Sequence, residues 1–141
     1  MWAYVDTSAM VKRYVRESGR PAVLKLFAQH NLVSSVILPV ELYSAFVRRT
    51  REGTLATTAL PRLFSRVGAD RPRWTLVETT AEVIGQAQTL VERHPLRTLD
   101  ALHLASARVF EKQLQLPVLF ISADHRQLAA AAREGLTVEP V

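Results

Sequence analysis

The 141-residue sequence contains no cysteine. This absence excludes disulfide bonds, zinc sites with thiolate ligands and cysteine nucleophiles. No apolar run approaches the roughly 18 residues that a membrane-spanning helix needs. A charged residue, Asp6, interrupts the N-terminal segment too early for the apolar core of a signal peptide. We therefore expect a cytoplasmic protein without membrane association.

Several catalytic motifs are also missing. The five glycines are scattered, so the sequence contains neither a GxGxxG motif nor a P-loop. The four histidines include no HExxH pair, which argues against a zinc enzyme, and the absence of a GxSxG elbow argues against a serine hydrolase. The chemistry of this protein has to come from other residue types.

The composition is that of an ordinary globular chain, with 48% hydrophobic and 22% charged residues. Its length suits one domain, which we place at residues 1–141. Short apolar segments alternate with helical patterns. This alternation predicts an α/β fold, in which a short, mostly parallel sheet of four to five strands is flanked by helices on both faces.

The expected elements have these bounds. We expect strands at residues 1–5, 31–33, 74–77, 117–121 and 136–138. We expect helices at residues 8–17, 20–29, from a cap at Ser34–Ser35 to about Arg51, 54–67 around Pro61 with Gly68 as the stop, 79–94, 98–114, and from Ala123 or Asp124 to near Gly135.

Four carboxylates stand alone in otherwise uncharged runs: Asp6, Glu41, Asp100 and Asp124. Two of them follow predicted strands, where parallel sheets gather functional residues, and the other two lie near the starts of apolar helices. If the four converge they repel one another, by about 4 kcal/mol per pair at 4 Å with an effective dielectric near 20. A divalent cation removes that conflict, and Mg²⁺ or Mn²⁺ suits carboxylate oxygens.

Each acid also has a purely structural interpretation, as a helix cap or as half of an ion pair. These alternatives are a cap on the first helix for Asp6, a pair with Arg48 or Arg49 for Glu41, a pair with Arg97 for Asp100, and a capping box with Gln127 for Asp124. His103 follows Asp100 by three residues and either tunes a carboxylate, touches substrate or packs in the core. Ser8 and Ser122 are either polar helpers of the acids or helix caps.

The net charge of +5 is concentrated in one stretch, because residues 48–73 contain seven arginines and only two acids. Arginine pairs with phosphate oxygens in a forked geometry, so this stretch favours a phosphate-bearing partner. A solvated helical surface is the alternative.

Four segments that contain the isolated acids resemble the four acidic motifs of the PIN-domain family, and more narrowly those of the VapC-type toxins of bacterial and archaeal toxin–antitoxin pairs. These segments are Tyr4–Ala9 (YVDTSA), Leu38–Leu42 (LPVEL), Leu96–Ala105 (LRTLDALHLA) and Phe120–Asp124 (FISAD). The resemblance covers essentially the whole chain, and the segment around Asp100 is its most specific part.

The resemblance implies a single PIN-like domain that acts as an Mg²⁺- or Mn²⁺-dependent endoribonuclease, leaving a 5′-phosphate and a 3′-hydroxyl. It implies catalytic and metal-binding roles for Asp6, Glu41, Asp100 and Asp124, with Ser8 as a helper. It also implies an antitoxin partner of the VapB type and a homodimer. Arginines of the basic stretch, among them Arg48, Arg49 and Arg51, are then expected to hold RNA.

Three alternatives remain open. One is a PIN nuclease of RNA processing that has no antitoxin, and another is a non-catalytic PIN module that binds RNA or protein. The third is a receiver-like phospho-acceptor domain, which normally has paired acids after its first strand and a lysine late in the chain. Here Asp6 stands alone and the last lysine is Lys112, which disfavours that fold.

Overall fold

Five parallel strands form one sheet in the order β3-β2-β1-β4-β5 in a computed structural model that describes residues 1–141. The strands are β1 (Trp2–Val5), β2 (Asn31–Ser35), β3 (Thr75–Val77), β4 (Val118–Ser122) and β5 (Thr137–Pro140). The predicted α/β class with a parallel sheet is therefore confirmed.

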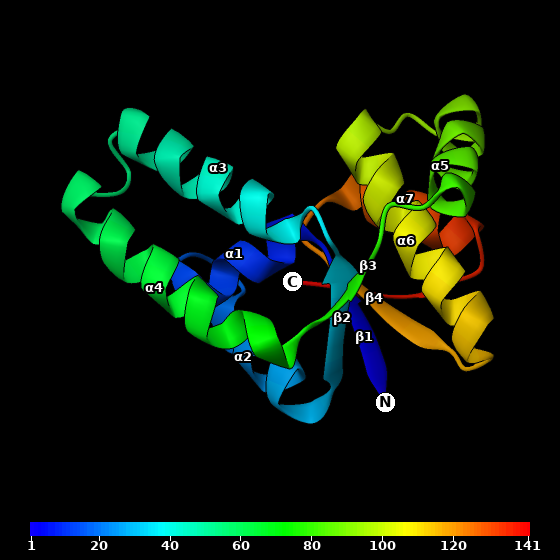
Figure 1. The fold of residues 1–141 in the computed structure, drawn as a ribbon, viewed down its shortest axis with the longest axis horizontal. Helices are drawn as coiled ribbons and strands as arrows, with labels where there is room; N and C mark the ends of the chain where they lie inside the picture. Colours follow the sequence, from blue (N-terminus) through cyan, green and yellow to red (C-terminus); the bar gives the residue numbers. More distant parts are fainter.

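Helices cover both faces of this sheet (Figure 1). The helices on one face are α1 (Thr7–Tyr14), α2 (Arg20–Gln29), α3 (Leu38–Arg51) and α4 (Leu60–Asp70). Those on the other face are α5 (Ala81–Arg93), α6 (Thr98–Leu114) and α7 (His125–Arg133). Short 3₁₀ turns lie at Thr57–Ala59 and Arg71–Arg73.

Side chains of the central strand alternate between two hydrophobic cores, as the period of a strand requires. Ala3 and Val5 pack against α1 to α4, whereas Tyr4 packs against α5 to α7. The Tyr4 ring stacks on Phe120 of the neighbouring strand β4, with the ring centroids 5.6 Å apart. Because β1 and β4 are neighbours, the residues that follow them meet at one edge of the sheet.

Helices α3 and α4 extend away from the sheet as a helical hairpin, which we call the arm (Figure 1). Asp70 anchors the base of the arm to α1. Its carboxylate accepts hydrogen bonds from Arg13 Nε at 2.8 Å, Arg13 Nη2 at 3.1 Å and the Tyr14 hydroxyl at 2.8 Å. The bidentate Arg13 contact holds the pKa of Asp70 below its usual value.

Several predicted boundaries are wrong. The last strand extends to Pro140 rather than 138, and the helical segment expected from residue 54 begins only at Thr57. Ser34 and Ser35 lie in β2 instead of capping α3, because Ser34 donates to the Val5 carbonyl at 2.6 Å and β2 continues its pairing with β3 through Ser35. Gly68 lies inside α4, which continues to its anchor at Asp70. The first helix ends at Tyr14, earlier than expected, and its last turn is basic.

None of the helices combines the length and the apolar character that crossing a bilayer requires.

Candidate active site

All four isolated carboxylates line a single cavity of about 360 Å³, which we call the acid cavity. Asp6 directly follows β1, and Asp124 follows β4 after one intervening residue. Glu41 lies in the first turn of α3, and Asp100 lies in the first turn of α6. Topology brings these residues together, because the carboxyl ends of β1 and β4 adjoin and both helices begin beside that edge.

Asp6 is a fully buried carboxylate that only neutral groups hold. Ser8 Oγ lies 2.8 Å from each of its oxygens, Ser122 Oγ donates to Oδ2 at 2.8 Å, and the Ala9 amide donates to Oδ1 at 3.0 Å. The Ala9 contact also caps α1, so Asp6 has the structural role as well as its place in the cavity. Burial raises the pKa of Asp6, although the charge of His103 and these donors oppose that shift.

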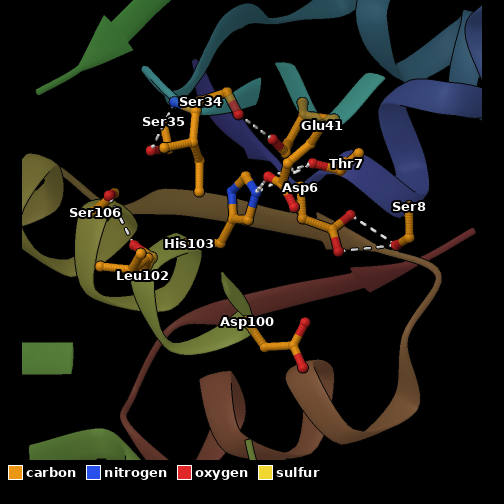
Figure 2. A network of polar contacts seen from close by, with 12 residues as sticks. Asp6, Thr7, Ser8, Ser34, Ser35, Glu41, Asp100, Leu102, His103 and Ser106 are labelled. Atoms are coloured by element: carbon orange, nitrogen blue, oxygen red, sulfur yellow. Dashed lines mark hydrogen bonds and ion pairs between the residues drawn. The ribbon is translucent and has the colours of Figure 1, made fainter. Parts of the chain in front are cut away.

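Glu41 is fixed by a buried histidine rather than by an arginine (Figure 2). His103 Nε2 lies 2.5 Å from Glu41 Oε1, and Thr7 Oγ1 donates to the same oxygen at 2.8 Å. On the other side of its ring, His103 Nδ1 lies 2.9 Å from the Tyr4 hydroxyl. Since a carboxylate only accepts, Nε2 carries the proton in the contact with Glu41. Of the roles considered for His103, the structure shows contact with a carboxylate and burial.

The alternative ion pair of Glu41 with Arg48 or Arg49 does not form. Arg49 Nη2 instead lies 2.7 Å from Glu17, and Arg48 faces Glu52 at 3.8 Å on an exposed part of α3. The orientation of Glu41 therefore depends on contacts that cross the sheet edge from α6 and α1.

Asp100 stands apart from this network, without a hydrogen bond to the other residues drawn in Figure 2. Its Oδ1 accepts from Gln127 Nε2 at 3.0 Å, and its Oδ2 accepts from the Arg97 amide at 3.2 Å. The expected ion pair with Arg97 is present at 3.5 Å, but the Arg97 side chain is 74% exposed. Such a pair contributes little to stability, and it leaves Asp100 available to the cavity.

Asp124 caps α7. Its Oδ1 accepts from the Arg126 amide at 2.8 Å and from the Gln127 amide at 3.4 Å, as the capping alternative predicted. The reciprocal half of the predicted capping box is absent, because the Gln127 side chain turns to Asp100 instead. Asp124 is thus both a helix cap and a residue of the acid cavity.

Gln127 is a cavity residue that the sequence did not single out as part of the site. It is 4% exposed, and its Oε1 has no hydrogen-bond partner although its Nε2 binds Asp100. One signal was available, because Gln127 precedes the buried residue Leu128 on an otherwise apolar side of α7. Tyr4 and Thr7 were missed because only the fold brings them to His103.

Basic side chains also line the acid cavity: Lys12, Arg48, Arg49 and Arg97. Lys12 is nearly buried, and its Nζ donates to the Ser18 carbonyl at 2.5 Å. Of the three arginines expected to hold RNA, Arg48 and Arg49 face this cavity, and Arg51 is not among the residues that line it. The cavity therefore combines carboxylates, of which Asp6 has only neutral donors, with cations suited to a phosphate group.

The model of the PIN domain family matches residues 3–134 of this chain. The chain belongs to the PIN domain family. The predicted membership of the PIN-domain family is thereby confirmed.

Relatives of this PIN domain include the Ribonuclease VapC47 of Mycobacterium tuberculosis (strain CDC 1551 / Oshkosh). It is 28% identical over an alignment of 153 residues that covers 97% of this chain and 96% of the relative. Among solved structures, a chain of VapBC2 from Rickettsia felis bound to a DNA fragment from their promoter has a TM-score of 0.68 and 14% identity, covering 99% of this chain and 98% of the other.

A chain of a toxin–antitoxin complex from Klebsiella pneumoniae has a TM-score of 0.60 and 16% identity, with 90% of each chain covered. At these identities the two structural likenesses establish the fold of the PIN domain.

The donor set of this PIN domain fits a hard divalent cation held by few protein ligands. No group of three or more acidic or histidine side chains is gathered tightly enough to hold one ion. Magnesium is, however, commonly bound through one or two carboxylates, with water and substrate phosphates in the other positions. Asp6, which has no cationic partner, and Asp100 supply oxygens of that kind. The site fits such an ion better than a closed cage of protein ligands.

Proposed function

We propose that this PIN domain is an endoribonuclease that depends on Mg²⁺ or Mn²⁺, and that it is the VapC-type toxin of a toxin–antitoxin pair. The observation that carries the proposal is the convergence of four isolated carboxylates on one cavity, with buried Asp6 held only by neutral donors. The ribonuclease name of the relative that aligns with 97% of the chain supports it.

Asp6 and Asp100 would be the principal ligands of the cation, with Asp124 and Glu41 completing the acidic site. A divalent ion held there would polarise the scissile phosphate and lower the pKa of a bound water. Ser8 and Ser122 orient the Asp6 carboxylate through their hydroxyls. Because Ser8 contacts both carboxylate oxygens and Ser122 contacts Oδ2, Asp6 keeps its position without needing a positive partner.

In this proposal, Glu41 holds the attacking water. Both of its hydrogen bonds reach Oε1, which leaves Oε2 as the oxygen that accepts a proton from water. The water oxygen attacks phosphorus in line, the bond from phosphorus to the 3′ oxygen breaks, and that oxygen takes up a proton. Because the bond to the 3′ oxygen is the one that breaks, the products are a 5′-phosphate and a 3′-hydroxyl. Lys12 and Arg49 line the same cavity and supply positive charges for phosphate oxygens.

Cleavage of defined single-stranded RNAs in Mg²⁺, Mn²⁺ or chelator tests the proposal. The wild-type protein should cleave with either ion and not with chelator, and Asp100→Asn should lower the rate by about 10³-fold or more, since it removes a charge from the reacting site. Glu92→Gln, which neutralises an exposed acid on α5, is the matched control and should cleave normally. Undiminished cleavage by Asp100→Asn would refute the assignment.

A wild-type protein that binds RNA without cutting it would instead favour the non-catalytic module. This outcome would be consistent with the fold and the family, and it would refute the proposed nuclease activity.

The proposed partners are a small antitoxin of the VapB type and a second copy of this chain. Both structural neighbours belong to toxin–antitoxin or VapBC assemblies, which supports the first partner. Co-expression with the product of a short upstream reading frame should yield a complex in which RNA cleavage is suppressed. Light scattering should give twice the chain mass of 15.8 kDa. A free nuclease that no neighbouring product inhibits would favour the antitoxin-free alternative.

A further inference from the structure

A second cavity, of about 410 Å³, lies between the α1–α2 connection and the arm. Four arginines line it and no acidic residue does, so we call it the arginine cavity. These arginines are Arg16, Arg20, Arg62 and Arg66. Its volume falls in the range of ligand pockets, roughly 300–1,000 Å³.

The four guanidinium groups have no acidic partners, although acids are close by in the fold. The nearby ion pairs, Arg13 with Asp70 and Arg49 with Glu17, use other arginines. Two groups of the cavity share one acceptor, because Arg20 Nη2 and Arg66 Nη2 lie 3.4 Å and 3.5 Å from the carbonyl oxygen of Arg13. Two like charges are thus held side by side at the carboxyl end of α1.

The donors of this cavity are only partly used. Arg20 Nε is buried and has no hydrogen-bond partner. The contacts at 3.4 Å and 3.5 Å are long for hydrogen bonds, whose usual N···O distance is about 2.9–3.0 Å. Arg66 is oriented by the Tyr14 ring, with its guanidinium carbon 5.3 Å from the ring centroid, and Asp70 fixes the Tyr14 hydroxyl in turn. An anion would relieve the repulsion and satisfy these donors.

Neighbouring residues line the arginine cavity and the acid cavity. Glu17 and Arg49 line the acid cavity, while Arg16 and Leu55 line the arginine cavity. Arg16 precedes Glu17 in the chain, and the Leu55 amide donates to the Arg49 carbonyl at 3.2 Å. Because the two linings adjoin at these residues, one chain with regularly spaced negative charges could reach both cavities.

We propose that the arginine cavity binds a phosphate group of the RNA chain away from the scissile bond. This inference rests on the proposed function. Forked guanidinium groups match phosphate oxygens in pairs, and the apolar side chains Val15, Leu55 and Leu63 in the lining suit a ribose or base. Continuity with the cavity where cleavage is proposed favours RNA over an acidic protein segment.

Binding of a fluorescein-labelled uridine dodecamer, measured in chelator over a range of salt concentrations, tests the proposal. Arg16→Gln/Arg62→Gln removes two exposed arginines that make no hydrogen bond within the protein. It should flatten the slope of log K against log salt by about 1 to 2. Lys25→Gln/Arg133→Gln is the matched control, since it removes the same charge from exposed positions outside both cavities and outside the basic stretch, and should leave the slope unchanged.

A second variant guards against effects on folding. Arg62→Lys keeps the positive charge and loses the paired donors of the guanidinium group. It should therefore weaken dodecamer binding while leaving the far-ultraviolet circular dichroism spectrum unchanged. Inorganic pyrophosphate should compete with the dodecamer on the wild-type protein and not on Arg16→Gln/Arg62→Gln.

Equal slopes for the double variant and its control would overturn the inference, even if the wild-type protein cleaves RNA with Mg²⁺. The RNA assignment would also be overturned if a hexaglutamate peptide bound the wild-type protein as tightly as the dodecamer and lost its binding in the same variant. The proposed function would fail in a distinguishable way. In that case the wild-type protein would bind the dodecamer with the expected salt dependence but would not cleave RNA in Mg²⁺ or Mn²⁺.

Discussion

The acid cavity and the arginine cavity are similar in size and opposite in the charges they leave unpaired. In the acid cavity, hydroxyls, an amide side chain and a histidine hold the carboxylates. In the arginine cavity, a backbone carbonyl holds Arg20 and Arg66, and an aromatic ring also orients Arg66. Asp6 in one cavity and these two arginines in the other are thus oriented by neutral groups and have no ion-pair partner. This difference from an ordinary ion pair indicates that each cavity is built to receive a charge from outside.

Glu134 shows what the fold does with an acid that has only a structural role. Its carboxylate joins α5, α6 and α7 by accepting from His94 Nε2 at 2.7 Å, Arg93 Nη1 at 3.4 Å and Arg108 Nη1. Burial acts to raise the pKa of Glu134, but the His94 hydrogen bond and the charges of Arg108 and Arg93 outweigh it and lower the pKa. The pKa of Asp6, whose donors are neutral, shifts in the opposite direction.

The largest effect on stability should come from Glu134→Gln. The change leaves His94, Arg93 and Arg108 without their shared acceptor, so we expect a loss of about 2 kcal/mol at neutral pH. Because the folded pKa of Glu134 is lowered, its contribution is present above the unfolded value near 4.5 and is lost as the pH falls below it. Urea unfolding at several pH values measures both the loss of stability and its dependence on pH. Equal stability of the variant and the wild-type protein at neutral pH would contradict the role of Glu134 as the shared acceptor of these three side chains.

Tyr4→Phe should cost less, about 1–2 kcal/mol, because it leaves the buried His103 Nδ1 without its partner. With His103 less well fixed, Glu41 loses orientation, and we expect cleavage to fall by about 10-fold with little change in KM. Tyr43→Phe, which removes a hydroxyl from an exposed tyrosine on α3, is the control for both measurements. A Tyr4→Phe enzyme with normal kcat would show that His103 acts only in packing.

Asp6→Asn should have a smaller effect on stability, and of opposite sign. Burial raises the pKa of Asp6 because it disfavours the charged carboxylate, so the uncharged amide should stabilise the ion-free fold at neutral pH by about 1 kcal/mol. Below the folded pKa the wild-type residue is protonated, so this gain should shrink as the pH falls. Thermal melts in chelator follow it, and a destabilised variant at neutral pH would remove the electrostatic argument.

Neutralising Arg48, Arg49 and Arg51 together should have the smallest effect on RNA binding. Arg49 is already paired with Glu17, and Arg48 faces Glu52. We expect the salt slope for the uridine dodecamer to fall by less than about 1, which is less than for Arg16→Gln/Arg62→Gln. A larger loss in the triple variant would reverse the comparison and assign the RNA path to α3.

Local patterns were sufficient to predict most of the fold and the gathering of the acids. The bounds of α6 agree at both ends, because Pro95 prevents an earlier start and the apolar pattern is continuous from Thr98 to Leu114. Asp6 was predictable because it directly follows an apolar strand. The prediction at Gly68 was wrong because this glycine does not adopt the positive φ with which Gly53 and Gly135 follow helix ends.

Contacts between distant residues were not predictable from spacing. Tyr4 and His103 are 99 positions apart, and Gln127 reaches Asp100 across 27 positions. The arginine cavity also brings together residues that are distant in the sequence. Arg16 and Arg20 come from the region between α1 and α2, and Arg62 and Arg66 come from the arm. Charge counting detected only the half of it that lies in residues 48–73, because the other half depends on how α4 returns to α1.

Calorimetric titration of Mn²⁺ into the wild-type protein and into Asp100→Asn and Arg62→Gln tests the division between the two cavities most directly. We predict that the wild-type protein and Arg62→Gln bind Mn²⁺ alike, and that Asp100→Asn binds it at least about 10-fold more weakly, since it loses a charged oxygen ligand. Equal Mn²⁺ binding by Asp100→Asn, or no binding by the wild-type protein, would contradict the account.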